Sequence, residues 1–195
     1  VTPDPLDERY RTVRTARARF CGYFRGIAVA QVPAILHVPS MLAGGEIVVF
    51  AIGERHLGLA STCVRELLRA VAPSPLPGAP AGIDGVIDVR GTIVPLVDLS
   101  QRIGVARRAL RASDQLLLCD GVLGPLAVRA DRILEIRSIE AIEAPPPAVE
   151  TVDPLVAGLV KLVDGVIVIC DLTALLDEAD LSALGDAIRA LAEGA

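Results

Sequence analysis

Histidine, cysteine and acidic side chains are the groups through which this chain could carry out catalysis or bind a metal ion. The two histidines, His37 and His56, have no carboxylate or thiol at the spacing of a recognisable catalytic motif. The four cysteines are dispersed and form no CxxC pair, which favours reduced thiols over structural zinc or a disulfide framework. Neither a Gly-rich phosphate-binding motif nor a GxSxG motif occurs. The sequence therefore predicts no catalytic residue, cofactor or metal.

Two aspartates could suggest a paired-carboxylate mechanism. Asp98 and Asp171 each stand just before a short helical pattern, "SQRI" and "TALL". A carboxylate at that position accepts hydrogen bonds from the free backbone N–H groups of a helical turn. We therefore predict that both aspartates are caps, and that Cys170, beside Asp171, is a buried core thiol.

The stretch "GVIDVRGTIVPLVDL" sets an arginine, Arg90, against a glycine, Gly91, between two strand-like segments. A buried, unpaired arginine is costly, so Arg90 either pairs with an acid such as Asp84 or Asp88 or is a solvated turn residue. The alternative is that Gly91 makes the turn and leaves Arg90 as a planar, multi-donor anchor at a protein interface. Both interpretations stay open from the residues alone.

The elements that must position these residues are mostly short strands. From Glu46 onward, runs of aliphatic residues are bounded by Gly, Pro and Asp, a pattern typical of a sandwich or barrel. The runs are "IVVFAI", "HLGLA", "VIDV", "TIVPLV", "QLLLC", "GPLAV", "RILEI", "GLVKLV" and "VIVIC".

The chain also repeats itself. Residues 85–98 align with 158–171, apolar on apolar at almost every position, and residues 56–67 align more weakly with 125–136. Each copy provides only about five short strands, too few for an independent core, so the two halves should bury apolar faces against each other. Their junction would form a groove.

Segments around the strands complete the prediction. Arg107, Arg108 and Arg111 indicate a solvated connection between the copies. Apolar residues at helical spacing predict a helix over about residues 180–193 that closes an exposed end of the barrels, with Asp180 as its N-cap. Residues 1–42 are predicted to be a poorly ordered extension or, because the only methionine is Met41, a segment outside the natural protein.

Composition narrows the function further. The 195 residues are 52% hydrophobic but only 3% aromatic, so an aliphatic core is expected. Residues 1–40 carry six Arg and three acids, which leaves 13 basic and 21 acidic residues in the rest of the chain. An acidic body argues against nucleic acid as a partner. Because no apolar run approaches 18 residues, direct membrane insertion is not expected either.

Two longer segments, "VVFAIGERHLGLASTCVRELLRAV" and "LPGAPAGIDGVIDVRGTIVPLVDL", resemble the CheW-like family of chemotaxis coupling proteins. In that family a strand ends in Arg-Gly and the next strand carries Pro before Asp-Leu. The resemblance covers about residues 47–176 and departs at Asp88 and Val89, where the family usually has a polar residue and leucine.

The resemblance implies an all-β fold with peripheral helices: two intertwined five-stranded SH3-like β-barrels and a C-terminal helix. The CheW-like domain would span 43–195, with a first barrel unit at about 46–105 and a second at about 113–177. This expectation agrees with the internal repeat.

The resemblance also implies a non-enzymatic adaptor in the cytoplasm, recruited to receptor arrays at the inner face of the membrane. Its implied partners are the regulatory domain of a CheA-type histidine kinase, the cytoplasmic signalling tip of methyl-accepting chemoreceptors, and further copies or paralogues in rings. Val64, Glu66 and Arg90 would lie on the partner-binding surface, with Gly85 and Gly91 shaping the turns beside it. The alternative is a small-ligand sensor or enzyme that uses the groove between the barrels. The resemblance does not indicate whether the signalling pathway controls flagellar movement or pilus motility.

Overall fold

The computed structural model describes residues 45–140, 142–143, 153–162 and 165–193. The predictions made for residues 1–42 and for Cys21 lie outside these residues.

The described residues form ten strands in two five-stranded sheets. The first sheet has the order β8-β1-β2-β10-β9 and the second has the order β3-β6-β7-β5-β4. The bounds are β1 Glu46–Ile52, β2 Arg55–Ala60, β3 Val64–Arg69, β4 Ile83–Val89, β5 Thr92–Val97, β6 Gln115–Gly121, β7 Gly124–Ala130, β8 Arg132–Ser138, β9 Val156–Leu162 and β10 Gly165–Cys170.

The two sheets repeat one pattern, as the sequence repeat does. If each strand of β1–β5 is exchanged with the strand five places later in the chain, the strand order of one sheet becomes the order of the other. Each sheet also has a single parallel pair, β2 with β10 in the first and β7 with β5 in the second. The first sheet combines β1 and β2 with β8, β9 and β10. Each repeated unit therefore supplies strands to both sheets, so the units at about 46–105 and 113–177 are not separate barrels. The intertwined all-β fold is confirmed.

The interior explains why the strands are so apolar. Side chains of β1 alternate between two cores: Val48 and Phe50 lie in a large core between the sheets, while Ile47 and Val49 lie in a smaller core within the first sheet. A third core, which includes Leu96, lies within the second sheet. Both faces of the central strands are thus buried, and the predicted burial of the two halves against each other is confirmed.

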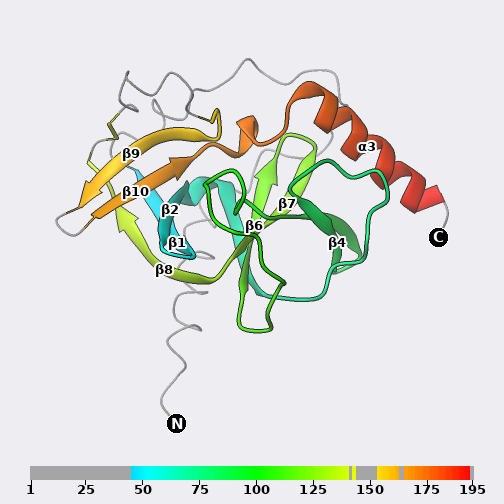
Figure 1. The fold of residues 1–195 in the computed structure, drawn as a ribbon, viewed down its shortest axis with the longest axis horizontal. Coiled ribbons are helices and arrows are strands. Elements are labelled where there is room, and N and C mark those ends of the chain that lie inside the picture. Colours follow the sequence, from blue (N-terminus) through cyan, green and yellow to red (C-terminus); the bar gives the residue numbers. More distant parts are fainter. Residues whose placement is uncertain (1–44, 141, 144–152, 163–164, 194–195) are drawn as a thin grey trace, which may run out of the picture.

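The C-terminal helix α3 spans Glu178–Glu193 and lies against the second sheet, on the side of β4 and β7 (Figure 1). The side chain of Asp177 accepts a hydrogen bond from the N–H of Asp180 at 2.8 Å. Asp177 is therefore the N-cap, and the predicted cap at Asp180 is wrong: Asp180 already lies within the first helical turn. Leu184 anchors the helix in the core between the sheets.

Two short 3-10 helices, η1 Ser61–Cys63 and η2 Leu172–Ala174, complete the fold. Asp171 caps η2 by accepting from the N–H of Thr173, and Asp98 accepts from the N–H of Ser100 at 2.8 Å. The predicted cap at Asp171 is confirmed, whereas Asp98 caps a turn at residues 100–104 in which no helix forms. Cys170 is buried as predicted, and this burial raises the pKa of its thiol to about 12.

Candidate partner-binding site

The β4–β5 hairpin turns on only two residues. Val89 pairs with Thr92, so Arg90 and Gly91 form the turn, with φ angles of +55° and +82°. Positive φ at both positions is the pattern of a type I′ turn, in which Gly, Asn and Asp are preferred. An arginine in this left-handed conformation costs roughly 1–2 kcal/mol. Arg90 therefore occupies a position that other residue types would fill with less strain.

The acid next to the turn stabilises it. The Asp88 carboxylate accepts a hydrogen bond from the N–H of Gly91 at 2.6 Å. Asp84, the other predicted partner of Arg90, is instead bound to Arg107. Neither predicted acid pairs with Arg90, because each is engaged elsewhere.

Arg90 forms a two-pronged ion pair with Glu66 on β3. Its Nη2 lies 2.6 Å from Oε1 of Glu66 and its Nη1 lies 2.9 Å from Oε2. Since β3 and β4 are the opposite edges of the second sheet, this pair links the two edges directly. The Arg90 side chain is 73% exposed and that of Glu66 is 33% exposed. Hydrogen bonding to Glu66 and its charge raise the pKa of Arg90.

Two predicted site residues lie in the interior. Val64 is only 5% exposed and packs in the core between the sheets. Gly85 is buried within β4 rather than in a turn, and an added Cβ there would lie 2.3 Å from the carbonyl oxygen of Ser74. Both residues are buried, so the predictions that Val64 lies on a binding surface and that Gly85 shapes a turn beside it are wrong.

The remaining surface site is compact. Arg90 and Gly91 are exposed at the hairpin tip, and Glu66 reaches them from the neighbouring edge. The sequence predicts these three residues as partner-binding residues but gives no indication that two of them are bonded to each other.

Of the three arginines predicted to be solvated between β5 and β6, Arg111 is exposed, whereas Arg107 and Arg108 belong to an ionic cluster around Arg129. The guanidinium of Arg129, only 5% exposed, donates to the backbone carbonyls of Arg108 and Ala109 at 2.9 Å each. Its nitrogens also lie 3.2 Å from Asp114 and 3.5 Å from Asp98. We call this set the Arg129 cluster; its members are Arg107, Arg108, Arg129, Asp84, Asp98, Asp114 and Asp131.

Within this cluster Asp114 makes stability depend on pH. Burial alone would raise the pKa of its carboxyl group, but hydrogen bonds from Arg108 and from the backbone N–H of Arg111 outweigh burial and lower that pKa below 3.8. Such a carboxylate stabilises the fold fully at pH values above its pKa in the unfolded chain. This stabilisation is lost as the pH falls from the pKa of the unfolded chain to the lower pKa of the folded protein. We expect the free energy of unfolding to decrease below about pH 4.

Urea unfolding of the wild type and of Asp114→Asn across the acid range measures this effect. The variant should start less stable and lose stability less steeply with falling pH, because it has no carboxylate to protonate. Parallel curves for the two proteins would contradict this role of Asp114.

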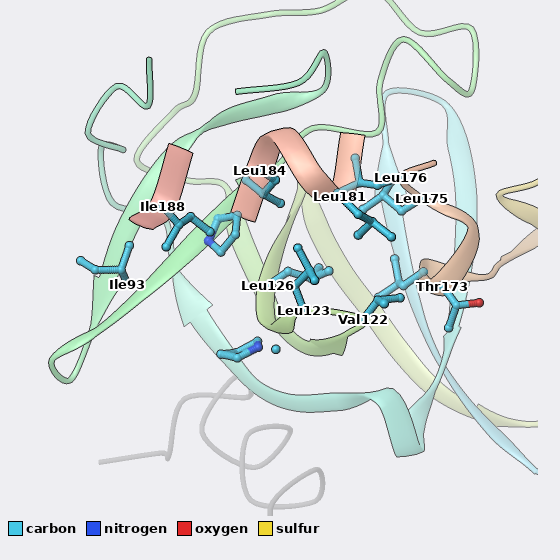
Figure 2. Close-up of a pocket in the computed structure, with 14 residues that line it drawn as sticks. Ile93, Val122, Leu123, Leu126, Thr173, Leu175, Leu176, Leu181, Leu184 and Ile188 are labelled. Carbon is cyan, nitrogen blue, oxygen red and sulfur yellow. The ribbon is translucent and has the colours of Figure 1, made fainter. Parts of the chain in front are cut away.

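Sequence reasoning missed an apolar pocket beside the hairpin. It has a volume of about 130 Å³ and is enclosed by α3, η2, the start of β5 and the β6–β7 turn (Figure 2). The signal in the sequence is the turn "GVLG", whose Val122 and Leu123 are 37% and 50% exposed where polar residues are usual. Ile93, which is 43% exposed, also lines the pocket and follows the Arg90 turn closely in the sequence. The lining residues are Ile93, Pro95, Val122, Leu123, Gly124, Pro125, Leu126, Leu172, Thr173, Leu175, Leu176, Leu181, Leu184 and Ile188.

The described residues hold no group of three or more His, Cys, Asp or Glu side chains arranged to bind a metal ion. In the same part of the chain, no helix combines the length and apolar character needed to cross a membrane.

Two intertwined five-stranded sheets give this chain an SH3-like β architecture. The CheW-like domain model matches residues 46–180. The chain therefore belongs to the CheW-like family of chemotaxis coupling proteins, and it is an adaptor of chemosensory signalling.

Individual relatives agree with the family model. The chemotaxis protein CheW of Treponema pallidum is 24% identical over 149 residues, which cover 72% of this chain and 87% of that protein. FrzA of Myxococcus xanthus is 34% identical over 100 residues, covering 50% of this chain and 61% of FrzA. The crystal structure of the scaffolding protein TtCheW from Thermoanaerobacter tengcongensis is similar with a TM-score of 0.63 and 29% identity, covering 70% of this chain and 95% of that one.

Proposed function

We propose that this chain couples chemoreceptors to a CheA-type histidine kinase without catalysing a reaction itself. It would bind the regulatory domain of the kinase and the cytoplasmic signalling tip of methyl-accepting receptors. We further propose that it works in the cytoplasm, in arrays at the inner face of the membrane, where further copies or paralogues extend the assembly into rings. Membership of the CheW-like family supports this proposal.

The observation that carries the proposal is the exposed Arg90–Glu66 pair. An exposed ion pair contributes only about 0–1 kcal/mol to stability, whereas the left-handed backbone at Arg90 costs roughly 1–2 kcal/mol. Stability alone therefore does not account for an arginine at this position. A partner that binds to the guanidinium does.

The chemistry of Arg90 indicates what it recognises. Two of the five guanidinium N–H groups bond to Glu66, which leaves three that can donate to a partner. Glu66 fixes the plane of the guanidinium, so these donors are oriented before binding. Carboxylate and backbone carbonyl oxygens on the partner are the matching acceptors.

Charge reversal of each member of the pair separates an interface role from a structural one. We expect Arg90→Glu and Glu66→Arg each to weaken binding to a partner at least about tenfold, a loss of 1.4 kcal/mol. The double variant, Arg90→Glu with Glu66→Arg, restores the ion pair but places an acid where the partner needs donors. It should therefore regain stability without regaining affinity.

Calorimetric titration of the full chain with the kinase regulatory domain, and separately with a receptor tip, measures these affinities. Glu135→Arg is the matched control, because Glu135 aligns with Glu66 in the sequence repeat but bonds to Arg137 in the first sheet. Full affinity for both partners in Arg90→Glu, with its fold verified by circular dichroism, would refute the assignment of the site.

A further inference from the structure

Four arginines of the fold form no ion pair with any other described residue, although all the other described arginines pair with a carboxylate. All four are exposed. Residues 41–195 carry 13 basic and 21 acidic residues, so a shortage of acids does not explain why these arginines are unpaired. The four are Arg55, Arg69, Arg111 and Arg132.

Backbone pairing places two of these arginines side by side. Arg69, the last residue of β3, pairs with Gln115, the first residue of β6. The N–H of Ala70 donates to the carbonyl of Asp114, and the N–H of Asp114 in turn donates to the carbonyl of Arg111. Arg111 therefore lies close to Arg69, at the start of β6.

The other two arginines join the same end of the molecule through Gln115. The side-chain oxygen of Gln115 accepts a hydrogen bond from the N–H of Ile133, which follows Arg132 at the start of β8. Arg132 pairs with Ala51 of β1, and Arg55 pairs with the residue that follows Ala51. We call this surface the basic end; its members are Arg55, Arg69, Arg111 and Arg132.

An exposed apolar side chain lies beside the basic end. Val71, which is 49% exposed, lies two residues beyond the end of β3. Nearby acids do not neutralise the arginines, because Asp114 and Asp131 are bound by Arg108 and only Glu54 remains, at the β1–β2 turn of the described chain. A positive surface beside an apolar side chain is complementary to an acidic surface with an apolar recess.

The pocket under α3 is such a recess. Its walls are almost entirely aliphatic, and its volume of about 130 Å³ is close to that of an apolar cavity of about 150 Å³ that accommodates a benzene ring, so a valine side chain fits. In Figure 2, α3 lines one wall with Leu181 and Leu184, and the β6–β7 turn lines another with Leu123. Residues 177–191, which include most of α3, carry four acids and one arginine. The pocket therefore lies beside an excess of negative charge.

The basic end and the pocket lie at opposite ends of one strand. β6 begins at Gln115, beside Arg69, and ends at Gly121, directly before the turn that lines the pocket. Its seven residues extend over roughly 20 Å. Val71 is therefore too far from the pocket of its own chain to enter it, whereas the pocket of a second copy is accessible to it.

We propose that this chain assembles head to tail: Val71 of one copy enters the pocket under α3 of the next, and the basic end lies along the acids of that helix. The contact joins two different surfaces, so each copy binds one neighbour at each end, and the assembly closes into a ring or continues as a filament. The proposal rests on the proposed function only in that it names the surfaces through which further copies would join the assembly. Neither the kinase nor the receptor takes part in the contact.

Sedimentation velocity of the full-length chain alone tests this contact. We expect the average sedimentation coefficient to rise with protein concentration at low salt, and the rise to be suppressed at about 1 M salt, where exposed charges are screened beyond about 3 Å. Val71→Asp and Leu123→Asp each place a carboxylate on one of the two apolar surfaces, so each should weaken association at least about tenfold. Ser138→Asp is the control, because Ser138 is exposed at the far end of β8 from Arg132.

An equal mixture of the two variants distinguishes a head-to-tail contact from a symmetric one. Val71→Asp keeps an intact pocket and Leu123→Asp keeps an intact Val71, so one contact forms between the two variants and association stops at a dimer. With the fold of each variant verified by circular dichroism, a mixture that forms no dimer would overturn the proposal. A wild type that stays monomeric at all concentrations but still binds the kinase regulatory domain would also overturn it, while leaving the proposed coupling function intact.

Discussion

Replacing Arg129 with methionine is expected to lower the free energy of unfolding by about 3–5 kcal/mol. Methionine fills much of the space of the arginine stem but provides no charge and no N–H group. The carboxylates of Asp98 and Asp114, both at least 96% buried as residues, would then lose a cationic partner. The carbonyls of Arg108 and Ala109 would lose their hydrogen-bond donors as well. The loss is large because two buried carboxylates and two carbonyl groups lose a partner at once, even though Arg108 still binds Asp114.

Urea unfolding of Arg129→Met and of a matched control, Arg189→Met, measures the difference. Arg189 pairs with Asp186 at 3.0 Å, but both side chains are 68% exposed, so its loss should cost at most about 1 kcal/mol. Similar losses in the two variants would show that the Arg129 cluster is no more stabilising than a surface ion pair.

Gly85→Ala is expected to cost about 3 kcal/mol or more, as backbone strain and broken hydrogen bonds add together. Gly85 has a φ of +137°, and its added Cβ would lie 2.3 Å from the carbonyl oxygen of Ser74. Ser74 covers the free edge of β4 by exchanging two backbone hydrogen bonds with Val86, at 2.8 and 2.9 Å. The methyl group would force this covering segment away from the edge.

Gly91→Ala is the control for Gly85→Ala. Gly91 also has a positive φ, +82°, but an added Cβ there meets no atom within 4 Å, so about 1 kcal/mol is expected. Thermal unfolding of both variants separates the two costs. Equal losses of stability in the two variants would show that the segment containing Ser74 can move away from Gly85 at no measurable cost in free energy.

The repeat explains why this edge protection occurs twice. Gly158 aligns with Gly85, and an added Cβ at Gly158 would meet the carbonyl oxygen of Glu143 at 3.0 Å. Glu143 pairs with Leu159 as Ser74 pairs with Val86. Both glycines therefore let a crossing segment approach an outer strand closely. The sequence repeat aligns the two glycines, but only the folded chain shows the segment that crosses each of them.

Strand prediction succeeded where aliphatic residues are continuous and failed at β3. The segment "VRELLR" carries Arg65, Glu66 and Arg69 at outward or half-buried positions, so its apolar character is low. Only the weak repeat, which aligns it with "RILEI" of β8, indicated a strand. Edge strands such as these two have one side without a strand partner, which accommodates more polar residues.

The site was predictable in part. From the Arg-Gly step and the resemblance to a family we predict Arg90, Gly91 and Glu66 as partner-binding residues, and the structure places these three together at the surface. The ion pair between Arg90 and Glu66 could not be predicted from spacing, because 24 residues separate them and only the curling of the second sheet brings its two edges together. The same limit applies to the Arg129 cluster, whose members come from separate strands and a connection.

Val64 and Gly85 illustrate the opposite error. They belong to the segments that resemble the family, but similarity along a segment does not distinguish residues that touch a partner from those that hold the strand in place. Alternation along β3 buries Val64, while its neighbour two positions on, Glu66, reaches the surface beyond a bulge between them. Burial in the folded chain was needed to separate the two roles.

The most direct test of the adaptor role is co-sedimentation of a CheA-type kinase with receptor-containing membranes, in the presence and absence of this chain. We predict that the chain increases the amount of kinase in the membrane pellet, that Arg90→Glu reduces this increase, and that Glu135→Arg preserves it. Kinase recovery that is independent of the chain, or a chain that sediments with receptors but recruits no kinase, would contradict the account.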